Sequence, residues 1–174
     1  MPPSDIAVLL DLDETLVLSG ALEQLRKQRN WVEVYARFAQ THVPSGTLKF
    51  ISDIKNRGDI EIGVVTKSPR PYAEKLLRFH GIEVPVLVAY HDVSRHKPHP
   101  EALLKAAENL NVPACRCIYI GDHPDDMAAA ASAKCIAIAI TWTAGSNIPG
   151  TCKSWEAVYD QVVSTCERLN GKEL

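Results

Sequence analysis

The sequence predicts a doubly wound α/β fold, in which a parallel sheet carries helices on both faces. Three observations favour this class: short apolar runs rich in β-branched residues recur along the chain, segments with helical periodicity separate them, and polar residues follow most of the runs. Strands and helices that alternate in this way form parallel sheets, because each parallel connection crosses over through a helix.

The predicted strands are buried on both faces, since they read as nearly continuous apolar runs rather than as alternating ones. Each run is short enough for a single strand. The five runs are residues 6–12 (IAVLLDL), 60–66 (IEIGVVT), 84–90 (VPVLVAY), 115–122 (CRCIYIGD) and 135–141 (CIAIAIT).

The predicted helices carry apolar residues at helical intervals, and turn residues mark several of their ends. Gly58 and Gly81 close two of these segments, as helix C-termini prefer, and Pro69, Pro100 and Pro124 open three others. The segments are residues 46–58, 69–81, 99–111, 124–134 and 154–170.

Composition and charge suit one globular domain. The chain has 174 residues, 46% of them hydrophobic and 23% charged, and we expect residues 1–174 to form a single domain without linkers or repeats. The formal net charge of −2 gives no general attraction to nucleic acid or to anionic membranes, so nucleic acid is expected at most as a substrate. No apolar run reaches the length of a membrane span, and the N-terminal MPPSDI does not resemble a signal peptide. We therefore expect a cytoplasmic protein that does not bind membranes.

The cysteines do not indicate a disulfide framework or a zinc site. Their number is odd, they are scattered, and the closest pair has no companion ligands at zinc spacing. We expect reduced, mostly buried thiols at Cys115, Cys117, Cys135, Cys152 and Cys166.

Polar side chains follow four of the five predicted strands. In a doubly wound fold these positions meet at one edge of the sheet, beyond the carboxyl ends of the strands, where ligands bind. The convergence therefore predicts a functional site at that edge. Its candidate residues are Asp11, Asp13 and Thr15, then Thr66, Lys67 and Ser68, then Lys97, and finally Asp122, Asp125 and Asp126.

Taken singly, several of these residues have a purely structural explanation. Asp122 or Asp125 could cap the next helix, and Lys97 could be a solvated loop residue. A cap does not explain Asp11, because Asp11 lies inside an apolar run, where an unpaired charge is costly. The combination of acids with one lysine therefore favours a functional site over solvated turns.

Four segments in order, DLDETL, VVTKS, KPHP and GDHPDD, resemble the four motifs of the haloacid dehalogenase superfamily of hydrolases. The resemblance extends from Ile6 to about Trp142. It implies a Rossmann-like sheet whose first strand is central, flanked by the strands that precede Thr66 and Asp122. The presence of Asp13 favours phosphate chemistry over dehalogenation.

The resemblance also implies a mechanism, namely hydrolysis of phosphate monoesters through an aspartyl-phosphate. Asp11 would be the nucleophile, and Asp13 would act as the acid and base for the leaving group and for water. Thr66 and the backbone N–H groups of Leu12 and Lys67 would bind the phosphoryl oxygens. Lys97 would supply a fixed positive charge.

The implied cofactor is Mg²⁺, which suits an oxygen-only site and offsets the repulsion between a carboxylate and a phosphate. By resemblance its ligands are the Asp11 carboxylate, the Asp13 backbone carbonyl and the Asp122 carboxylate.

Two details of the motifs leave choices open. Asp126 matches the second acid of the fourth motif, but Asp125 is adjacent, and either could hold a metal-bound water or orient Lys97. Two lysines depart from the common pattern. Lys67 follows the second-motif threonine, where asparagine or a small residue is commoner, and Lys134 stands where many relatives have glycine in a turn.

A cap domain has little room in this chain. Residues 20–45 suffice for one long or two short helices, so we expect a rudimentary cap and an open site that accepts large phosphorylated substrates. Several residues of this insert could touch a substrate, or could form a solvated basic face with its aromatic rings packed on the core. They are Arg26, Lys27, Arg29, Trp31, Tyr35 and Arg37.

Other functions stay open at this stage. The chain could be a phosphotransferase, or a phospho-acceptor or phosphate-binding module that needs a partner. The sequence names neither the phosphorylated substrate nor the oligomeric state, monomer or dimer.

Overall fold

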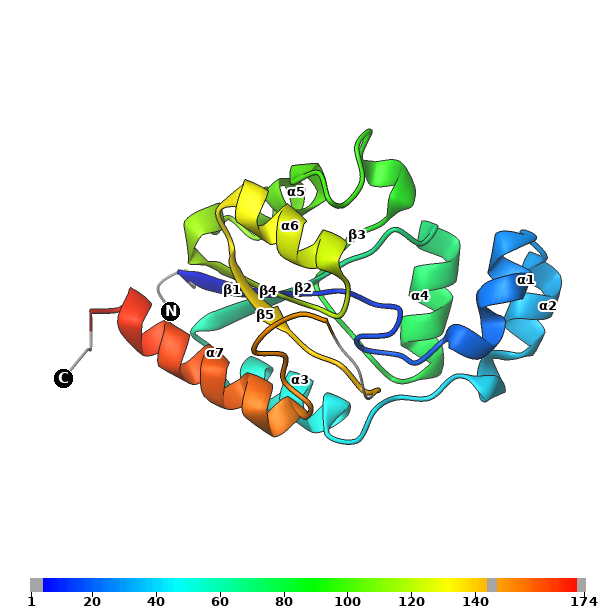
Figure 1. Cartoon of the computed structure of the whole chain (residues 1–174), viewed down its shortest axis with the longest axis horizontal. Coiled ribbons are helices and arrows are strands. Elements are labelled where there is room, and N and C mark those ends of the chain that lie inside the picture. Colours follow the sequence, from blue (N-terminus) through cyan, green and yellow to red (C-terminus); the bar gives the residue numbers. More distant parts are fainter. Residues whose placement is uncertain (1–4, 144–146, 172–174) are drawn as a thin grey trace.

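The computed structural model describes residues 5–143 and 147–171. Its centre is a five-stranded, fully parallel sheet with the strand order β3-β2-β1-β4-β5 (Figure 1). The predicted α/β fold class is therefore confirmed, with the first strand in the middle. The strands are β1 (Ile6–Leu10), β2 (Ile60–Val65), β3 (Val86–Val88), β4 (Cys117–Gly121) and β5 (Ile136–Ala139).

The strands end earlier than the predicted runs, because the polar residues lie just past their carboxyl ends. Strand β1 ends at Leu10, and the Asp11 backbone N–H still donates to the Ile120 carbonyl at 2.9 Å. Strand β2 ends at Val65, one residue before Thr66. The candidate site residues thus begin immediately after the strands end.

All five predicted helices are present, each shorter than its segment by one or two residues at one or both ends. The described residues also form four 3₁₀ turns. The helices are α3 (Thr47–Arg57), α4 (Arg70–Phe79), α5 (Glu101–Asn109), α6 (Pro124–Ala133) and α7 (Trp155–Leu169). The 3₁₀ turns are η1 (Gly20–Leu22), η2 (Phe38–Gln40), η3 (Tyr90–Asp92) and η4 (Ala114–Arg116).

The turn chemistry explains several helix ends. Gly58 terminates α3 with a left-handed φ of 69°, which glycine adopts without strain. Lys134 takes the same role after α6 at φ 60°, so this lysine does occupy a turn position that favours glycine.

Helices cover both faces of the sheet (Figure 1). Helices α5 and α6 pack on one face, and α3, α4 and α7 pack on the other. Side chains of β1 alternate between them: Ala7 and Leu9 face the α5–α6 layer, whereas Val8 and Leu10 face the other layer. Asp11 continues the first series and so points toward the α5–α6 side of the edge.

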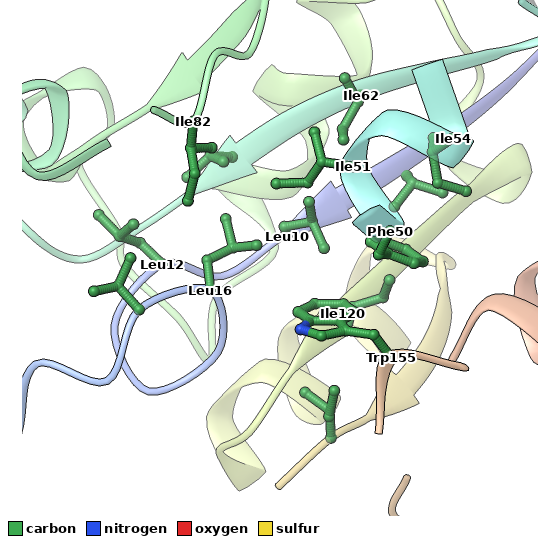
Figure 2. Close-up of a cluster of buried hydrophobic side chains, with 14 of the residues drawn as sticks. Leu10, Leu12, Leu16, Phe50, Ile51, Ile54, Ile62, Ile82, Ile120 and Trp155 are labelled. Atoms are coloured by element: carbon green, nitrogen blue, oxygen red, sulfur yellow. The ribbon is translucent and has the colours of Figure 1, made fainter. Parts of the chain in front are cut away.

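Figure 2 shows the larger of the two cores, between the sheet and helices α3, α4 and α7. Phe50 and Trp155 stack with ring centroids 4.5 Å apart. The buried Trp155 indole donates to the Thr47 hydroxyl at 2.6 Å, which satisfies its one polar atom. The long buried interface gives the sheet a rigid base for the residues at its edge.

Residues 20–45, for which the sequence predicts a short insert, contain two brief helices, α1 (Glu23–Lys27) and α2 (Trp31–Ala36). The insert lies beyond the end of β1, on the far side of α4 from the sheet (Figure 1). Its own residues Leu22, Val34 and Phe38 are buried, and the Trp31 ring lies 6.0 Å from the Tyr72 ring of α4. Its aromatic face is therefore packed on the core.

The cysteines are unbridged, with Cys115 exposed and the other four buried. Among the described residues, no helix combines the length and the apolar character that crossing a membrane requires. The expectation about the extreme N-terminus concerns residues 1–4, which lie outside the described residues.

Candidate active site

A cavity of about 350 Å³ opens at the carboxyl edge of the sheet. It brings together residues from the ends of three strands, from the loop before α5 and from the insert. Of the residues singled out from the sequence, the following line it: Asp11, Asp13, Thr66, Lys67, Ser68, Lys97, Asp122, Asp125 and Asp126.

Lys97 is the centre of a buried polar cluster. It is only 6% exposed, and its Nζ donates to Asp11 Oδ1 at 2.7 Å, to Asp126 Oδ1 at 2.7 Å and to the Tyr119 hydroxyl at 2.8 Å. All three donor positions of the ammonium are thereby used. The peptide bond between Lys97 and Pro98 is cis. The alternative that Lys97 is a solvated loop residue is therefore wrong, because its side chain turns inward.

Negative charge exceeds positive charge in this cluster. Burial works to lower the pKa of Lys97, but the carboxylates of Asp11 and Asp126 outweigh it and raise that pKa. Burial raises the pKa of Asp11 to about 8, although the Lys97 ammonium opposes this change. Burial also raises the pKa of Asp122, against the hydrogen bond from Thr15. Of these three acids, Asp11 and Asp126 share the one buried cation and Asp122 has no contact with it, so a second cation would stabilise their ionised forms.

Asp126 and Asp125 occupy different environments. Asp126 is 1% exposed, and besides Lys97 it accepts from the Tyr119 hydroxyl at 3.1 Å and from the His123 backbone N–H at 3.0 Å. Asp125 faces outward and pairs with Lys67 at 3.1 Å. The structure therefore places Asp126 in the interior position and Asp125 on the rim.

Gly121 makes room for Asp126. A Cβ at Gly121 would lie 2.5 Å from Asp126 Oδ2, so any side chain at this point of β4 would displace the carboxylate. Glycine is needed here for space, since its backbone angles are ordinary.

Three carboxylates form a candidate metal centre. One oxygen from each of Asp11, Asp122 and Asp126 lies within 4.8 Å of the others. Thr15 donates to Asp122 Oδ1 at 2.9 Å and orients it. Because Asp126 already accepts on both oxygens, Asp11 and Asp122 are the better direct ligands. The Asp13 carboxylate is not in this set, which leaves its predicted backbone carbonyl ligand a prediction.

Asp13 is held by a second polar cluster. Its Oδ1 lies 2.5 Å from Arg26 Nη1 and accepts from the Ser19 and Tyr72 hydroxyls at 2.5 and 2.7 Å. Its Oδ2 accepts from the Ser68 hydroxyl at 2.6 Å. Asp11 and Asp13 therefore share a cavity but have separate partners.

The remaining predicted residues lie around these clusters. Thr66 is buried, and its hydroxyl accepts from the Ser68 backbone N–H at 3.0 Å. Lys67 is exposed at the rim. Leu12 is fully buried, and its carbonyl accepts from the Leu16 and Val17 backbone N–H groups at 2.9 and 3.0 Å, which folds the chain back under the site.

Sequence reasoning missed Tyr119, Tyr72 and Ser19 as site residues. Tyr119 offered one signal, since a tyrosine in the middle of a buried strand needs a partner for its hydroxyl. Tyr72 and Ser19 offered none, because their contact with Asp13 depends on how the insert packs against α4.

Known proteins resemble this chain in sequence and in fold. A family model described as haloacid dehalogenase-like hydrolase matches residues 19–134. That match begins after Asp11 and Asp13, so the assignment of those two residues depends on the motif and on the cavity.

Curated relatives include a putative pyrophosphatase, PpaX, of Caldanaerobacter subterraneus, which is 31% identical over 121 residues, or 68% of this chain and 54% of the relative. The phosphoglycolate phosphatase of Escherichia coli (strain K12) is 29% identical over 129 residues, or 70% of this chain and 50% of the relative. The chain thus spans about half the length of the curated relatives it matches.

Two solved structures share the fold. A putative beta-phosphoglucomutase from Thermotoga maritima superposes with a TM-score of 0.77 at 18% identity, covering 91% of this chain and 99% of the other. A hydrolase from Geobacter sulfurreducens superposes with a TM-score of 0.73 at 17% identity, covering 90% and 98%. At these identities the likeness shows the fold alone.

Proposed function

The chain belongs to the haloacid dehalogenase-like hydrolases, and from this we propose that it is a magnesium-dependent phosphatase that hydrolyses phosphate monoesters through an aspartyl-phosphate on Asp11. The single observation that supports this most is the surroundings of Asp11. Its carboxylate lies at the floor of an open cavity, one oxygen is held by Lys97, and a second acid, Asp122, lies close enough to share a cation.

In the proposed first step, Asp11 Oδ2 attacks phosphorus while Lys97 holds Oδ1. The bond between Asp11 and phosphorus forms as the bond to the ester oxygen breaks, and the electron pair of that bond goes to the leaving oxygen. Thr66 and the backbone N–H groups of Leu12 and Lys67 are proposed to bind the transferring oxygens. The fixed charge of Lys97 stabilises the extra negative charge in the transition state.

The residues of the site fit Mg²⁺. The candidate ligands are all oxygens, as a hard divalent cation prefers, and the acids outnumber the one buried lysine. Bound by Asp11 and Asp122, Mg²⁺ would supply the positive charge that lets an anionic carboxylate approach an anionic phosphoryl group. Asp126 would act by orienting Lys97.

Asp13 is proposed to give a proton to the leaving oxygen and then to accept one from the attacking water. That water breaks the bond between phosphorus and Asp11 and releases inorganic phosphate. The direction in which the Asp13 carboxylate points is set by the four residues that contact it, which are Ser19, Tyr72, Arg26 and Ser68. With Asp13 as acid and base, we expect the aspartyl-phosphate to be hydrolysed rapidly rather than to persist as in a phospho-acceptor. Hydrolysis is favoured over transfer of the phosphoryl group to a second alcohol only if water reaches the site.

The test is release of phosphate from a broad panel of p-nitrophenyl phosphate, sugar phosphates, nucleotides, phosphopeptides and 3′- or 5′-phosphorylated oligonucleotides. We expect turnover with Mg²⁺, no turnover with EDTA, and loss of at least about a thousandfold in Asp11→Asn. Asp160→Asn on the exposed face of α7 is the matched control and should keep full activity.

Activity that survives in Asp11→Asn would contradict the proposal. Binding of phosphate without turnover on any substrate would instead support a phosphate-binding module that needs a partner.

A further inference from the structure

A second cavity, of about 760 Å³, lies between the insert and the edge of the sheet. We call it the insert groove and define it by the lining residues Glu23, Arg26, Lys27, Arg29, Trp31 and Lys67. The proposed catalytic steps use only the Lys67 backbone N–H and the contact of Arg26 with Asp13, so the other charges of the groove need an explanation of their own.

The insert groove is continuous with the catalytic cavity. Glu23, Arg26, Lys67 and Ser68 line both. Arg26 stands at the junction, with Nη1 2.5 Å from Asp13 Oδ1, the group proposed to protonate the leaving oxygen. The atoms attached to that oxygen must therefore pass Arg26, and the groove is where the rest of the leaving group would lie.

Positive charge dominates the groove. Four of its six defining residues are arginine or lysine, and Glu23 is the one acid among them. Lys27 pairs with Glu23 at 2.7 Å, and Lys67 pairs with Asp125 outside the groove. Within residues 5–143 and 147–171, Arg29 forms no ion pair. The groove thus retains a cation that no carboxylate of the described chain neutralises.

Arg26 offers a further donor. Its side chain is only 19% exposed, and its Nε is buried without a hydrogen-bond partner among the described residues. A buried N–H without a partner costs free energy and leaves part of the hydrogen-bonding capacity of Arg26 unused. Because guanidinium groups bind carboxylate and phosphate in a planar, two-point manner, Arg26 can hold Asp13 and still contact a ligand anion.

The turn between α1 and α2 sets these residues in place. The Arg29 backbone N–H donates to the Arg26 carbonyl at 3.0 Å, and Arg29 adopts a left-handed φ of 55°. This conformation is unusual for a residue with a side chain. Trp31 follows two residues after Arg29 and provides an aromatic wall, so the groove combines a flat apolar surface with cations.

From this we infer that the insert groove binds the leaving group of the substrate and selects phosphate monoesters whose leaving group carries a second anionic group, a carboxylate or a phosphate. The inference deepens the proposed function and depends on it. It also replaces the picture of a purely solvated basic face, since Arg26 is neither solvated nor fully paired.

The test compares two esters that differ only in that charge. One is the phosphate ester of 3-(4-hydroxyphenyl)propanoate, and the other is the ester of the corresponding primary amide, whose saturated linker keeps the acidity of the leaving phenol nearly equal. We expect kcat/KM for the acid to exceed that for the amide by about tenfold at low salt, and the ratio to fall at high salt. A second pair, propane-1,3-diol bisphosphate and monophosphate, tests phosphate as the anion.

Variants of the groove sharpen the test. Arg29→Gln should lower the acid-to-amide ratio toward one, and Glu23→Gln should raise it. Arg37→Gln is the matched control, because Arg37 lies on the same insert but pairs with Glu33 outside both cavities. Equal kcat/KM for both members of each pair, or a ratio that Arg29→Gln leaves unchanged, would overturn the inference.

Failure of the inference is distinguishable from failure of the proposed function. Hydrolysis of both esters at equal rates would refute the groove and leave the phosphatase intact. Hydrolysis of neither ester, together with no turnover on the broad panel above, would refute the phosphatase. In that case, calorimetry in EDTA with the phosphonate analogues of the acid and amide esters would test the groove without turnover. Tighter binding of the acid analogue supports the inference, and equal binding of the two overturns it.

Discussion

Asp11 and Asp13 are two residues apart in the sequence, yet different parts of the molecule hold them. Asp11 faces the α5–α6 side and is held by Lys97, within a cluster that reaches into β4 and α6. Asp13 faces the insert and is held by Arg26, with hydroxyls from α4 and from the start of the insert.

The comparison separates two roles. The surroundings of Asp11 belong to the sheet and its helices, which are packed like any protein core and tolerate little change. The surroundings of Asp13 include a short, partly exposed insert, whose exposed residues can change without disturbing the core. Chemistry should therefore depend on the first region, and selection of the leaving group on the second.

The largest effect is expected from Lys97→Gln. The change leaves the buried carboxylates of Asp11 and Asp126 without their cation, which should cost about 3–5 kcal/mol in the free energy of unfolding and at least about a hundredfold in kcat. Urea unfolding measures the change in the free energy of unfolding, and phosphate release measures the change in kcat. The exposed Lys55→Gln on α3 is the control, and a Lys97→Gln protein as stable and active as this control would break the comparison.

Gly121→Ala tests how rigid the Asp11 region is. The new Cβ would lie 2.5 Å from an Asp126 oxygen, and Asp126 cannot move without losing Lys97. We expect a loss of about 1–3 kcal/mol in the free energy of unfolding, together with lower kcat. Gly20→Ala in the insert is matched to it, since its Cβ would meet Glu14 Oε1 at an ordinary 3.6 Å and should change stability little. Equal losses of stability in Gly121→Ala and Gly20→Ala would contradict the distinction between a rigid Asp11 region and a tolerant insert.

A pair of tyrosines allows a direct contrast between the regions. Tyr119 is fully buried and contacts both Lys97 and Asp126, so Tyr119→Phe should lower the free energy of unfolding by about 1.5–3 kcal/mol. Tyr72 is fully buried as well, but besides its hydrogen bond to Asp13 it accepts a longer one, of 3.3 Å, from Arg26. Tyr72→Phe should therefore cost about 1 kcal/mol, with its main effect on kcat through the position of Asp13. Thermal unfolding and kinetics of both variants measure these effects. A larger loss of stability in Tyr72→Phe than in Tyr119→Phe would contradict the account.

The smallest effect concerns how the insert is attached. His80, at the end of α4, contacts the Thr41 hydroxyl at 2.6 Å. Burial, together with His42, lowers the pKa of His80 below its ordinary 6.5. Because the unfolded chain then binds more protons, stability should be complete above pH 6.5 and fall as the pH drops toward the lower folded pKa. An NMR titration of the histidine rings checks the sign, and a His80 pKa at or above 6.5 would refute it.

Much of the fold could be predicted from the sequence, because strands buried on both faces and helices with clear end signals read independently of tertiary contacts. The five strands and five main helices occur where the pattern places them, and the motif residues gather at one edge. The turn at Lys134, where the family resemblance places glycine, is left-handed in the structure.

The contacts that separate Asp11 from Asp13 could not be predicted in this way. Whether Asp125 or Asp126 points inward depends on the rotation of α6 at its first turn, and the inward direction of Lys97 depends on a loop. The contact between Arg26 and Asp13 joins the insert to the site through packing against α4, for which no local pattern gives a signal.

The central claim is that Asp11 is the nucleophile while Asp13 serves the leaving group. The most direct measurement is to quench the protein in acid during turnover, reduce any acyl phosphate with borohydride and locate the modified residue by mass spectrometry. The account predicts reduction of Asp11 to homoserine, in the wild type and in Arg29→Gln alike. Modification at Asp13 instead, or turnover with no acyl phosphate at either residue, would contradict it.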